Sequence, residues 1–252
     1  MPKPMLEAKN LTMKFGNLTA SNNVSFSVDK GEIVSLIGPN GAGKTTIFNC
    51  ISGFYKPFSG RVYFEGKDIT GLSPYKITSM GLTRTFQIVK PLKEMTVKEN
   101  ILTGAFLRAS SRSEAEKIAD EILKITHLSE KKDVLAGSLT TADKKRLEIA
   151  RVLATKPKMI MLDEAMAGLN QTETKEAMEL CLNLNKQHGI TLLIVEHVME
   201  AIMPISNRVI VLNAGEKIAE GSPEEIVNNE EVIKAYLGER YHAKSKQTNR
   251  RV

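Results

Sequence analysis

The sequence has no long run of apolar residues and very little cysteine. No apolar segment approaches the roughly 20 residues that a membrane-spanning helix needs, and residues 1–4 lack the apolar region of a secretion signal. We therefore expect neither a membrane helix nor secretion. The chain has 2 cysteines, Cys50 and Cys181, which lie far apart in the sequence without a Cys/His metal-ligand pattern. We expect both to be buried thiols in a reducing cytoplasm.

Positive charge is in excess, but much of it lies at one end of the chain. The formal net charge is +6, and residues 241–252 contain basic side chains and no acidic one: Lys244, Lys246, Arg250 and Arg251. Residues 1–240 therefore hold only +2. A nucleic-acid-binding body is normally more basic, so we expect no nucleic-acid partner. We expect residues 241–252 to form a disordered, solvated tail, with a role near anionic lipid as the alternative.

What the sequence does contain is a phosphate-binding loop. Residues 38–46 complete the pattern G-x-x-x-x-G-K-[ST]: Gly38, Pro39, Asn40, Gly41, Ala42, Gly43, Lys44, Thr45 and Thr46. An apolar run at residues 33–37 precedes the loop and apolar residues at helical spacing follow it, which predicts a strand–loop–helix unit. The bare pattern arises by chance in roughly one chain in a hundred of this length. In this setting we predict nucleotide binding, in preference to a glycine-rich turn with an incidental lysine.

Each part of the loop has a chemical task. Gly38, Gly41 and Gly43 let backbone N–H groups close around phosphate oxygens, and the N-terminus of the following helix adds its positive end. Lys44 can then reach the β- and γ-phosphates, and the Thr45 hydroxyl can bind Mg²⁺.

Predicted strands and helices alternate through the chain. We expect strands at residues 6–15, 24–28, 33–37, 60–66, 159–162, 191–195 and 209–212, with turns at 16–17 and 21–23. We expect helices at residues 113–126, 147–154, 172–186 and 198–203. This pattern predicts an α/β fold with a mostly parallel sheet, helices on both faces and N-terminal antiparallel strands. The helical stretch that interrupts the alternation predicts an inserted helical lobe at about residues 96–156.

Two acidic residues end a buried strand downstream of the loop. Asp163 and Glu164 follow the apolar residues 159–162, and an acid at the C-terminal end of a strand faces the site in an open α/β sheet. Asp163 suits Mg²⁺, directly or through water, and Glu164 suits orienting or deprotonating the attacking water. Alone, such a pair is often a solvated strand end. After a complete phosphate loop, we interpret it as functional.

Three further residues complete the candidate set. His197 ends another buried strand on the side where the nucleotide should lie, so we predict contact with the γ-phosphate in preference to a purely structural histidine. Gln87 closes a short strand before the helical lobe, and its amide can touch Mg²⁺ or water and report their presence to that lobe. Phe15 can stack on adenine or fill the core.

The order of these features resembles the ATPase subunit of ABC transporters, over nearly the whole chain from about residue 6 to 238. The resemblance implies a nucleotide-binding domain at residues 1–240, ATP and Mg²⁺ as cofactors, and ATP hydrolysis coupled to transport. It makes Glu164 the catalytic carboxylate, Gln87 the switch residue at the lobe boundary and His197 the γ-phosphate sensor. It also implies that Phe15 stacks on adenine and that residues 167–170 face a second subunit.

Finer details are similar to the importers of branched-chain amino acids. They are residues 81–87, 95–100, 167–170 and 231–238, and the segment Arg-Thr-Phe-Gln at 84–87 points to one of two ATPase paralogues in such systems. The resemblance implies permease subunits and a paralogous ATPase, or a second copy of this chain, at the cytoplasmic face of the membrane. A periplasmic or extracellular solute-binding protein would act indirectly. An importer of urea, short amides or other amino acids is the alternative.

The chain departs from the broader family at two places. Where the family has Leu-Ser-Gly-Gly-Gln, residues 139–143 are Leu-Thr-Thr-Ala-Asp. Thr140 keeps a hydroxyl at the helix start, but Thr141 and Ala142 put Cβ atoms where glycine lets backbone approach a phosphate. A similar form occurs in some members of the branched-chain group. Ala165 replaces the usual proline after the catalytic glutamate, which should loosen the backbone there.

Two other classes of protein share a phosphate loop. A soluble ABC ATPase of DNA repair or translation would carry a long coiled coil or two tandem cassettes, and a nucleotide kinase would carry an acceptor site and an arginine-rich lid. The sequence shows none of these patterns. We therefore interpret the chain as the ATPase of an importer, whose solute is chosen by other subunits.

Overall fold

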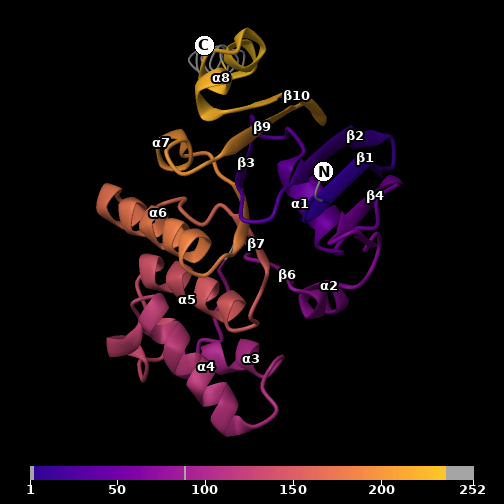
Figure 1. The fold of residues 1–252 in the computed structure, drawn as a ribbon. Helices are drawn as coiled ribbons and strands as arrows, with labels where there is room; N and C mark the ends of the chain where they lie inside the picture. Colours follow the sequence, from indigo (N-terminus) through magenta and orange to yellow (C-terminus); the bar gives the residue numbers. More distant parts are fainter. Residues whose placement is uncertain (1–2, 88, 237–252) are drawn as a thin grey trace, which may run out of the picture. The chain divides into compact units, whose positions relative to one another are not determined.

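The computed structural model describes residues 3–87 and 89–236, which divide into two compact units. One unit contains the residues up to Gly71 together with those from Ser206 onward, and the other runs from Leu72 to Ile205. Each unit has its own strands and helices (Figure 1). The tail expected at residues 241–252 lies outside the described residues. The limits expected for the nucleotide-binding domain and its helical lobe stay predictions.

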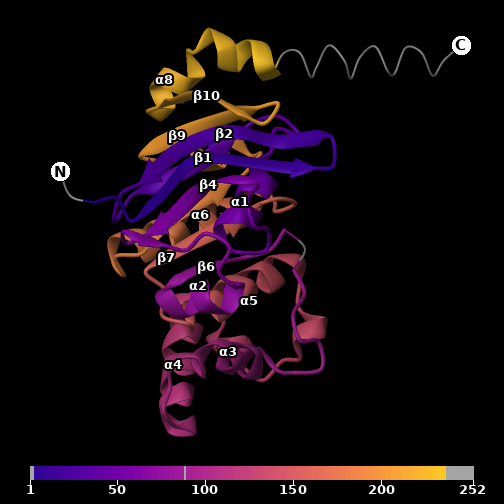
Figure 2. The same cartoon turned by 90° about the vertical axis from the view of Figure 1, so that its right-hand side faces the viewer.

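The first unit contains an antiparallel sheet. Its strands, in the spatial order β2-β1-β4-β5, are β1 (Leu6–Phe15), β2 (Leu18–Val28), β4 (Ser59–Phe64) and β5 (Lys67–Asp68). β1 pairs with β2 from Leu6 opposite Val28 to Phe15 opposite Leu18. The helix α1 (Lys44–Ile51) contacts both β1 and β2, and Figure 2 shows it beside them. The buried apolar residues of α1 recur at helical spacing and so lie on one side of the helix.

A second group of strands in the first unit leads into the phosphate loop. β3 (Ile33–Ile37) runs parallel to β9 (Arg208–Asn213), and β10 (Glu216–Gly221) pairs antiparallel with β9. Every residue of β3 is buried, as its largely apolar sequence predicts. A short helix, α8 (Pro223–Val227), follows β10 and begins with a capping box formed by Ser222 and Glu225.

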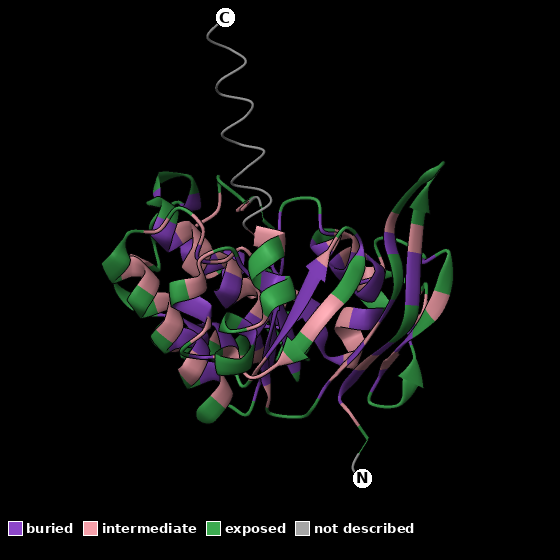
Figure 3. Ribbon diagram, turned by 90° about the horizontal axis from the view of Figure 1, so that it is seen from above, coloured by how far each residue is buried: buried purple, intermediate pink, exposed green. Residues whose placement is uncertain are grey.

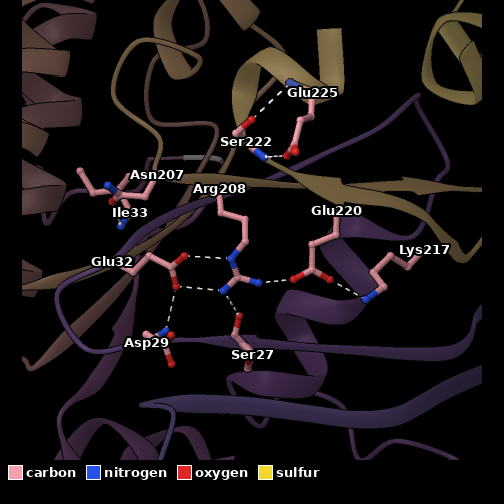
Figure 4. A network of polar contacts seen from close by, with 10 residues as sticks. All are labelled: Ser27, Asp29, Glu32, Ile33, Asn207, Arg208, Lys217, Glu220, Ser222 and Glu225. Atoms are coloured by element: carbon pink, nitrogen blue, oxygen red, sulfur yellow. Dashed lines mark hydrogen bonds and ion pairs between the residues drawn. The ribbon is translucent and has the colours of Figure 1, made fainter. Parts of the chain in front are cut away.

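Arg208, the first residue of β9, connects three segments of the first unit (Figure 4). Its Nε and Nη2 atoms each donate to the Glu32 carboxylate at 2.9 Å, and Nη2 also donates to the Ser27 carbonyl at 2.8 Å. Its Nη1 atom donates to Glu220 of β10. The guanidinium thus joins the end of β2 and the start of β3 to the β9–β10 hairpin. The two-point contact with Glu32 is a geometry that lysine does not reproduce.

The second unit is built on three parallel strands. β7 (Met159–Asp163) pairs with β6 (Leu82–Arg84) on one side and with β8 (Thr191–Val195) on the other. Every residue of β7 and β8 is buried, and Figure 3 shows such long buried stretches along the strands. The surrounding helices are α2 (Pro74–Met80), α6 (Gln171–Lys186) and α7 (Met199–Ile202). α6 links β7 to β8, as right-handed parallel connections require.

Three helices lie between β6 and β7 in the sequence. They are α3 (Val97–Ala105), α4 (Arg112–Ile125) and α5 (Thr141–Leu153), and α3 contacts both of the others. Each begins at a hydroxyl that accepts a hydrogen bond from a backbone N–H three residues on: Thr96, Ser111 and Thr140. Two 3₁₀ turns, Ser129–Lys131 and Ala136–Ser138, connect α4 to α5. The helices predicted at residues 113–126 and 147–154 are therefore confirmed.

The N-terminal hairpin differs from the prediction. The sequence predicts a turn at residues 21–23, but these residues lie within β2, and that prediction is wrong. The strand accommodates them because its pairing with β1 is irregular at several points. Asn23, with a φ of 52°, donates its N–H to the Thr12 hydroxyl at 3.0 Å. Asparagine tolerates this left-handed conformation better than most residues, so the strand continues through it.

Candidate active site

The phosphate loop follows β3, and its last three residues are the first three of α1. Gly38 has a φ of 149°, and a Cβ there would lie 2.1 Å from the carbonyl oxygen of Leu212. Gly43 has a φ of 96°, and a Cβ there would lie 2.5 Å from the carbonyl oxygen of Ala20. Both positions therefore require glycine, first because of the backbone conformation and then because of the close neighbouring backbone. The loop's path is fixed by the protein itself.

Lys44 points back over this loop. Its side chain is only 6% exposed, and Nζ donates to the carbonyl oxygens of Gly38 at 2.7 Å and Pro39 at 2.9 Å. The N-cap of α1 is Gly43, without a side-chain acceptor, and the first turn of α1 has no acid. By contrast, α3, α4, α5, α6 and α8 each have a side-chain cap and an acid in the first turn. The α1 terminus is therefore electrostatically suited to an anion.

The other loop residues differ in exposure. Asn40, Gly41 and Thr45 are exposed, Thr46 is half-buried and Ala42 is 2% exposed. An exposed Thr45 hydroxyl at the start of α1 fits the role predicted for it as a Mg²⁺ ligand, because Mg²⁺ prefers oxygen donors.

Phe15 lies at the end of β1 with 43% of its surface exposed. Its ring meets the ring of Tyr55 edge to face, with centroids 5.3 Å apart. Sequence reasoning did not single out Tyr55, because an aromatic residue in the connection after α1 has no spacing signal. The pair leaves Phe15 as an exposed ring with a fixed neighbour, which suits base stacking better than core filling.

In the second unit, β7 ends at a buried ion pair. Asp163 is 1% exposed, and its Oδ2 accepts a hydrogen bond from Nη2 of Arg84 at 2.7 Å. The Asp163 N–H donates to the Thr85 hydroxyl at 3.0 Å. Burial lowers the pKa of Arg84, and the Asp163 carboxylate opposes this decrease. Arg84, from the neighbouring strand β6, thus holds the acid at a defined position.

Glu164, Gln87 and His197 lie together. One carboxylate oxygen of Glu164, Oε2, accepts a hydrogen bond from Nε2 of Gln87 at 2.8 Å. The other, Oε1, lies 2.9 Å from Nε2 of His197. The Glu164 side chain is 15% exposed and that of His197 37%. The three residues predicted to be catalytic therefore form one partly exposed cluster at the C-terminal ends of β6, β7 and β8.

Three charged residues near this cluster were not found from the sequence. On α5, Lys145 donates from Nζ to the backbone carbonyl of Glu164 at 2.7 Å, and Glu148 accepts from the Phe86 N–H at 2.6 Å. Glu196 is 0% exposed and accepts from the N–H groups of Met166 at 2.6 Å and His197 at 3.3 Å. The sequence offers one signal for Glu196, an acid directly after residues 191–195. An acid at a strand end, however, is often a solvated residue.

Burial shifts the pKa values of these three groups in the direction of the neutral form. It raises the pKa of Glu196 to about 7, although hydrogen bonds from Met166 and His197 oppose the change. It also raises the pKa of Glu148, against the hydrogen bond from Phe86. It lowers the pKa of Lys145, against the attraction of Glu196, Glu148 and Glu164. These three side chains thus lie in low-dielectric surroundings.

The variant signature opens α5. Thr140 Oγ1 accepts from the Asp143 N–H at 3.2 Å and donates to the Asp143 carboxylate at 2.8 Å, and Lys131 also binds that carboxylate. Thr141 is exposed and Ala142 is 9% exposed. Thr140 and Asp143 therefore act as a local cap of the helix, and the exposed Thr141 takes no part in this cap.

Comparison with known proteins agrees with these features. A family model described as "ABC transporter" matches residues 21–167, and one described as "Branched-chain amino acid ATP-binding cassette transporter" matches residues 216–242. The chain is 44% identical to the high-affinity branched-chain amino acid transport ATP-binding protein BraF of Pseudomonas aeruginosa. It is 46% identical to the corresponding protein LivG of Escherichia coli K12. Each alignment covers 95% of this chain and 100% of the relative.

Solved structures show the same fold. The ADP conformation of an ATP-binding cassette of an ABC transporter matches with a TM-score of 0.85 and 37% identity, over 94% of this chain and 99% of that one. A nucleotide-free cassette matches with a TM-score of 0.84 and 36% identity, over 93% of this chain and 99% of that one. The fold is therefore that of a phosphate-loop ATPase cassette, and the predicted fold class is confirmed. The chain belongs to the ABC transporter family, as an ATP-binding, ATP-hydrolysing subunit.

Proposed function

We propose that this chain hydrolyses Mg-ATP to drive the import of branched-chain amino acids through separate permease subunits. The observation that carries the catalytic part is the placement of Glu164 between Gln87 and His197, each within 3 Å of one of its carboxylate oxygens. The solute class rests on the BraF and LivG relatives, which share 44% and 46% of their residues with this chain.

The first unit would bind the nucleotide. The phosphate loop and the uncapped N-terminus of α1 offer backbone N–H groups and a positive dipole end to the phosphates. Lys44 would exchange its hydrogen bonds to Gly38 and Pro39 for contacts with the β- and γ-phosphates. Phe15, held by Tyr55, would stack on the adenine.

The second unit would act on the γ-phosphate. Glu164 would take the proton of the attacking water. His197, bound to Glu164, would contact the γ-phosphate and hold the carboxylate in its rotamer. Thr45, Gln87 and Asp163 would hold Mg²⁺ through oxygen atoms, and the ion would neutralise charge on the phosphates. We infer from the order of the motifs in the sequence that both units act on one nucleotide.

We also propose that the chain works as one of a pair, with a paralogous ATPase or a second copy of itself, on permeases at the cytoplasmic face of the membrane. Within residues 3–87 and 89–236, no helix is long and apolar enough to cross a bilayer. The exposed Thr141 would face the nucleotide of the partner subunit in place of a glycine. With a partner that keeps the glycine-rich form, the two sites of the pair would not be equivalent.

The test uses the transporter complex that co-purifies with the tagged full-length chain. Glu164→Gln should keep ATP binding and lower ATP turnover by at least about 10²-fold, the effect of losing a general base. Glu179→Gln, the same substitution at an exposed position of α6, is the control and should leave turnover unchanged. Near-normal turnover in the Glu164→Gln complex would refute the assignment. Uptake of labelled leucine, with labelled urea in parallel, tests the solute: urea uptake without leucine uptake would overturn that part.

A further inference from the structure

Glu164 has an unusual backbone as well as a functional side chain. Its φ is 51°, in the left-handed region, which costs a residue with a Cβ roughly 1–2 kcal/mol. Both of its backbone polar groups have partners: the N–H donates to the Val195 carbonyl at 2.9 Å, and the carbonyl accepts from Lys145 Nζ at 2.7 Å. The first contact comes from the end of β8, and the second comes from a side chain of α5. The strained conformation is therefore held from two sides.

The direction of the Glu164 side chain depends on this backbone conformation. A change in the φ angle of Glu164 would move its carbonyl away from Lys145 and, because Cβ turns about the same N–Cα bond, would also redirect the carboxylate. In the observed orientation the carboxylate is within hydrogen-bond distance of both Gln87 and His197. Lys145 therefore constrains where the Glu164 carboxylate points, although its Nζ contacts neither carboxylate oxygen.

The same face of α5 holds a second segment of the site. Glu148 lies three residues after Lys145, on the same side of the helix, and accepts the Phe86 N–H at 2.6 Å. Phe86 directly precedes Gln87, the other partner of the Glu164 carboxylate. One turn of α5 therefore fixes the backbone on both sides of the Gln87–Glu164 hydrogen bond.

We propose that Lys145 is a positioning residue for ATP hydrolysis, which orients the Glu164 carboxylate by binding the Glu164 backbone carbonyl. This inference rests on the proposed function of Glu164 as the general base. Glu148 plays the parallel part for Gln87. Since the variant signature opens the same helix at Thr140, a displacement of α5 changes the aim of the catalytic carboxylate through Lys145. Burial lowers the pKa of Lys145, and the carboxylates of Glu196, Glu148 and Glu164 oppose the decrease.

Three variants in the co-purified complex test the proposal. Lys145→Met removes the donor and keeps the length of the side chain; we expect kcat to fall about tenfold or more, as the loss of a hydrogen bond from a charged group allows. The KM for ATP and the binding of ATP should change by less than about twofold. Lys145→Arg restores a cationic donor and should recover most of kcat. The control is Lys144→Met, because the Lys144 side chain makes no hydrogen bond or ion pair within the described residues.

Combination with Glu164→Gln separates positioning from a merely structural role. If Lys145 acts through Glu164, then Lys145→Met should cause little further loss of turnover in the Glu164→Gln background. An equal loss in both backgrounds, or a parallel loss of ATP binding and thermal stability, would overturn the proposal. Full activity of Lys145→Met while Glu164→Gln is inactive would also overturn it. Normal activity of Glu164→Gln would instead refute the proposed function on which it rests.

Discussion

The buried carboxyl of Glu196 should make the stability of the protein depend on pH. Its side chain is 0% exposed, and its Oε1 and Oε2 atoms accept the backbone N–H groups of Met166 and His197. Burial raises its pKa from an ordinary 4.5 to about 7, so desolvation outweighs both hydrogen bonds. Lys145 favours the charged form and Glu164 disfavours it, as smaller contributions.

The sign follows from the two pKa values of Glu196. Below about pH 4.5 the carboxyl is protonated in both the folded and the unfolded chain, and it causes no pH-dependent change in stability. Between about pH 4.5 and 7 the unfolded chain releases the proton while the folded chain keeps it, so the unfolded state becomes more stable relative to the folded state. Above about pH 7 the carboxyl is charged in both states, and the free energy of unfolding has fallen by its full amount, about 3 kcal/mol. Between pH 5 and pH 8 the loss is about 2.5 kcal/mol.

The measurement is urea unfolding of the wild type and of Glu196→Gln at pH 5 and at pH 8. Gln cannot titrate, so the variant should gain about 2.5 kcal/mol relative to the wild type between the two pH values. Any fixed cost of the substitution, such as the amide group facing the His197 N–H, is the same at both and cancels. A difference between variant and wild type that does not change with pH would show that Glu196 titrates normally. The reasoning about its burial would then be refuted.

Two further predictions concern the first unit. Gly38→Ala should lower the free energy of unfolding by at least about 2 kcal/mol, because its Cβ would lie 2.1 Å from the Leu212 carbonyl oxygen. A Cβ at Gly41 would meet nothing within 4 Å, so Gly41→Ala should lower the free energy of unfolding by only about 1 kcal/mol, through its positive φ. Equal losses in urea unfolding would contradict this. Arg208→Met should cost about 2 kcal/mol, since Glu32 loses its cation and Glu220 keeps only Lys217. Arg208→Lys should recover only part, and full recovery would show that the two-point geometry is unimportant.

The fold was largely predictable because its buried strands are plain apolar runs. The runs at residues 33–37, 159–162 and 191–195 are each followed by a glycine or an acid, and the structure places β3, β7 and β8 there within one residue. Parallel strands buried on both faces leave this signature in a single sequence. The N-terminal hairpin was less predictable, because irregular pairing of β1 with β2 absorbs residues that usually make turns.

Tertiary contacts decided the parts that the sequence did not reveal. The strand β5 has only 2 residues, and no residue of β10 is buried. The helices α2 and α8 have 7 and 5 residues, which is too short for a clear helical period. From the sequence, Arg84 stands out only as part of the segment 84–87, yet in the structure it forms the buried ion pair with Asp163. Its partner lies on a neighbouring strand, 79 residues away in the sequence, and no local pattern links the two.

In the candidate site, too, the residues that carry the chemistry can be predicted from the sequence, whereas the residues that position them cannot. Groups that touch a phosphate, a metal ion or water must be of particular types, so Lys44, Glu164 and His197 stand out from a single sequence. Groups that hold the backbone need only donate or accept a hydrogen bond at the right place. Lys145 reaches a carbonyl and Glu148 an N–H, tasks for which several side chains serve, and on a helix surface they look like ordinary solvated charges. Such residues become visible only when the structure shows which backbone groups they bind, and here those groups belong to the residues that carry the chemistry.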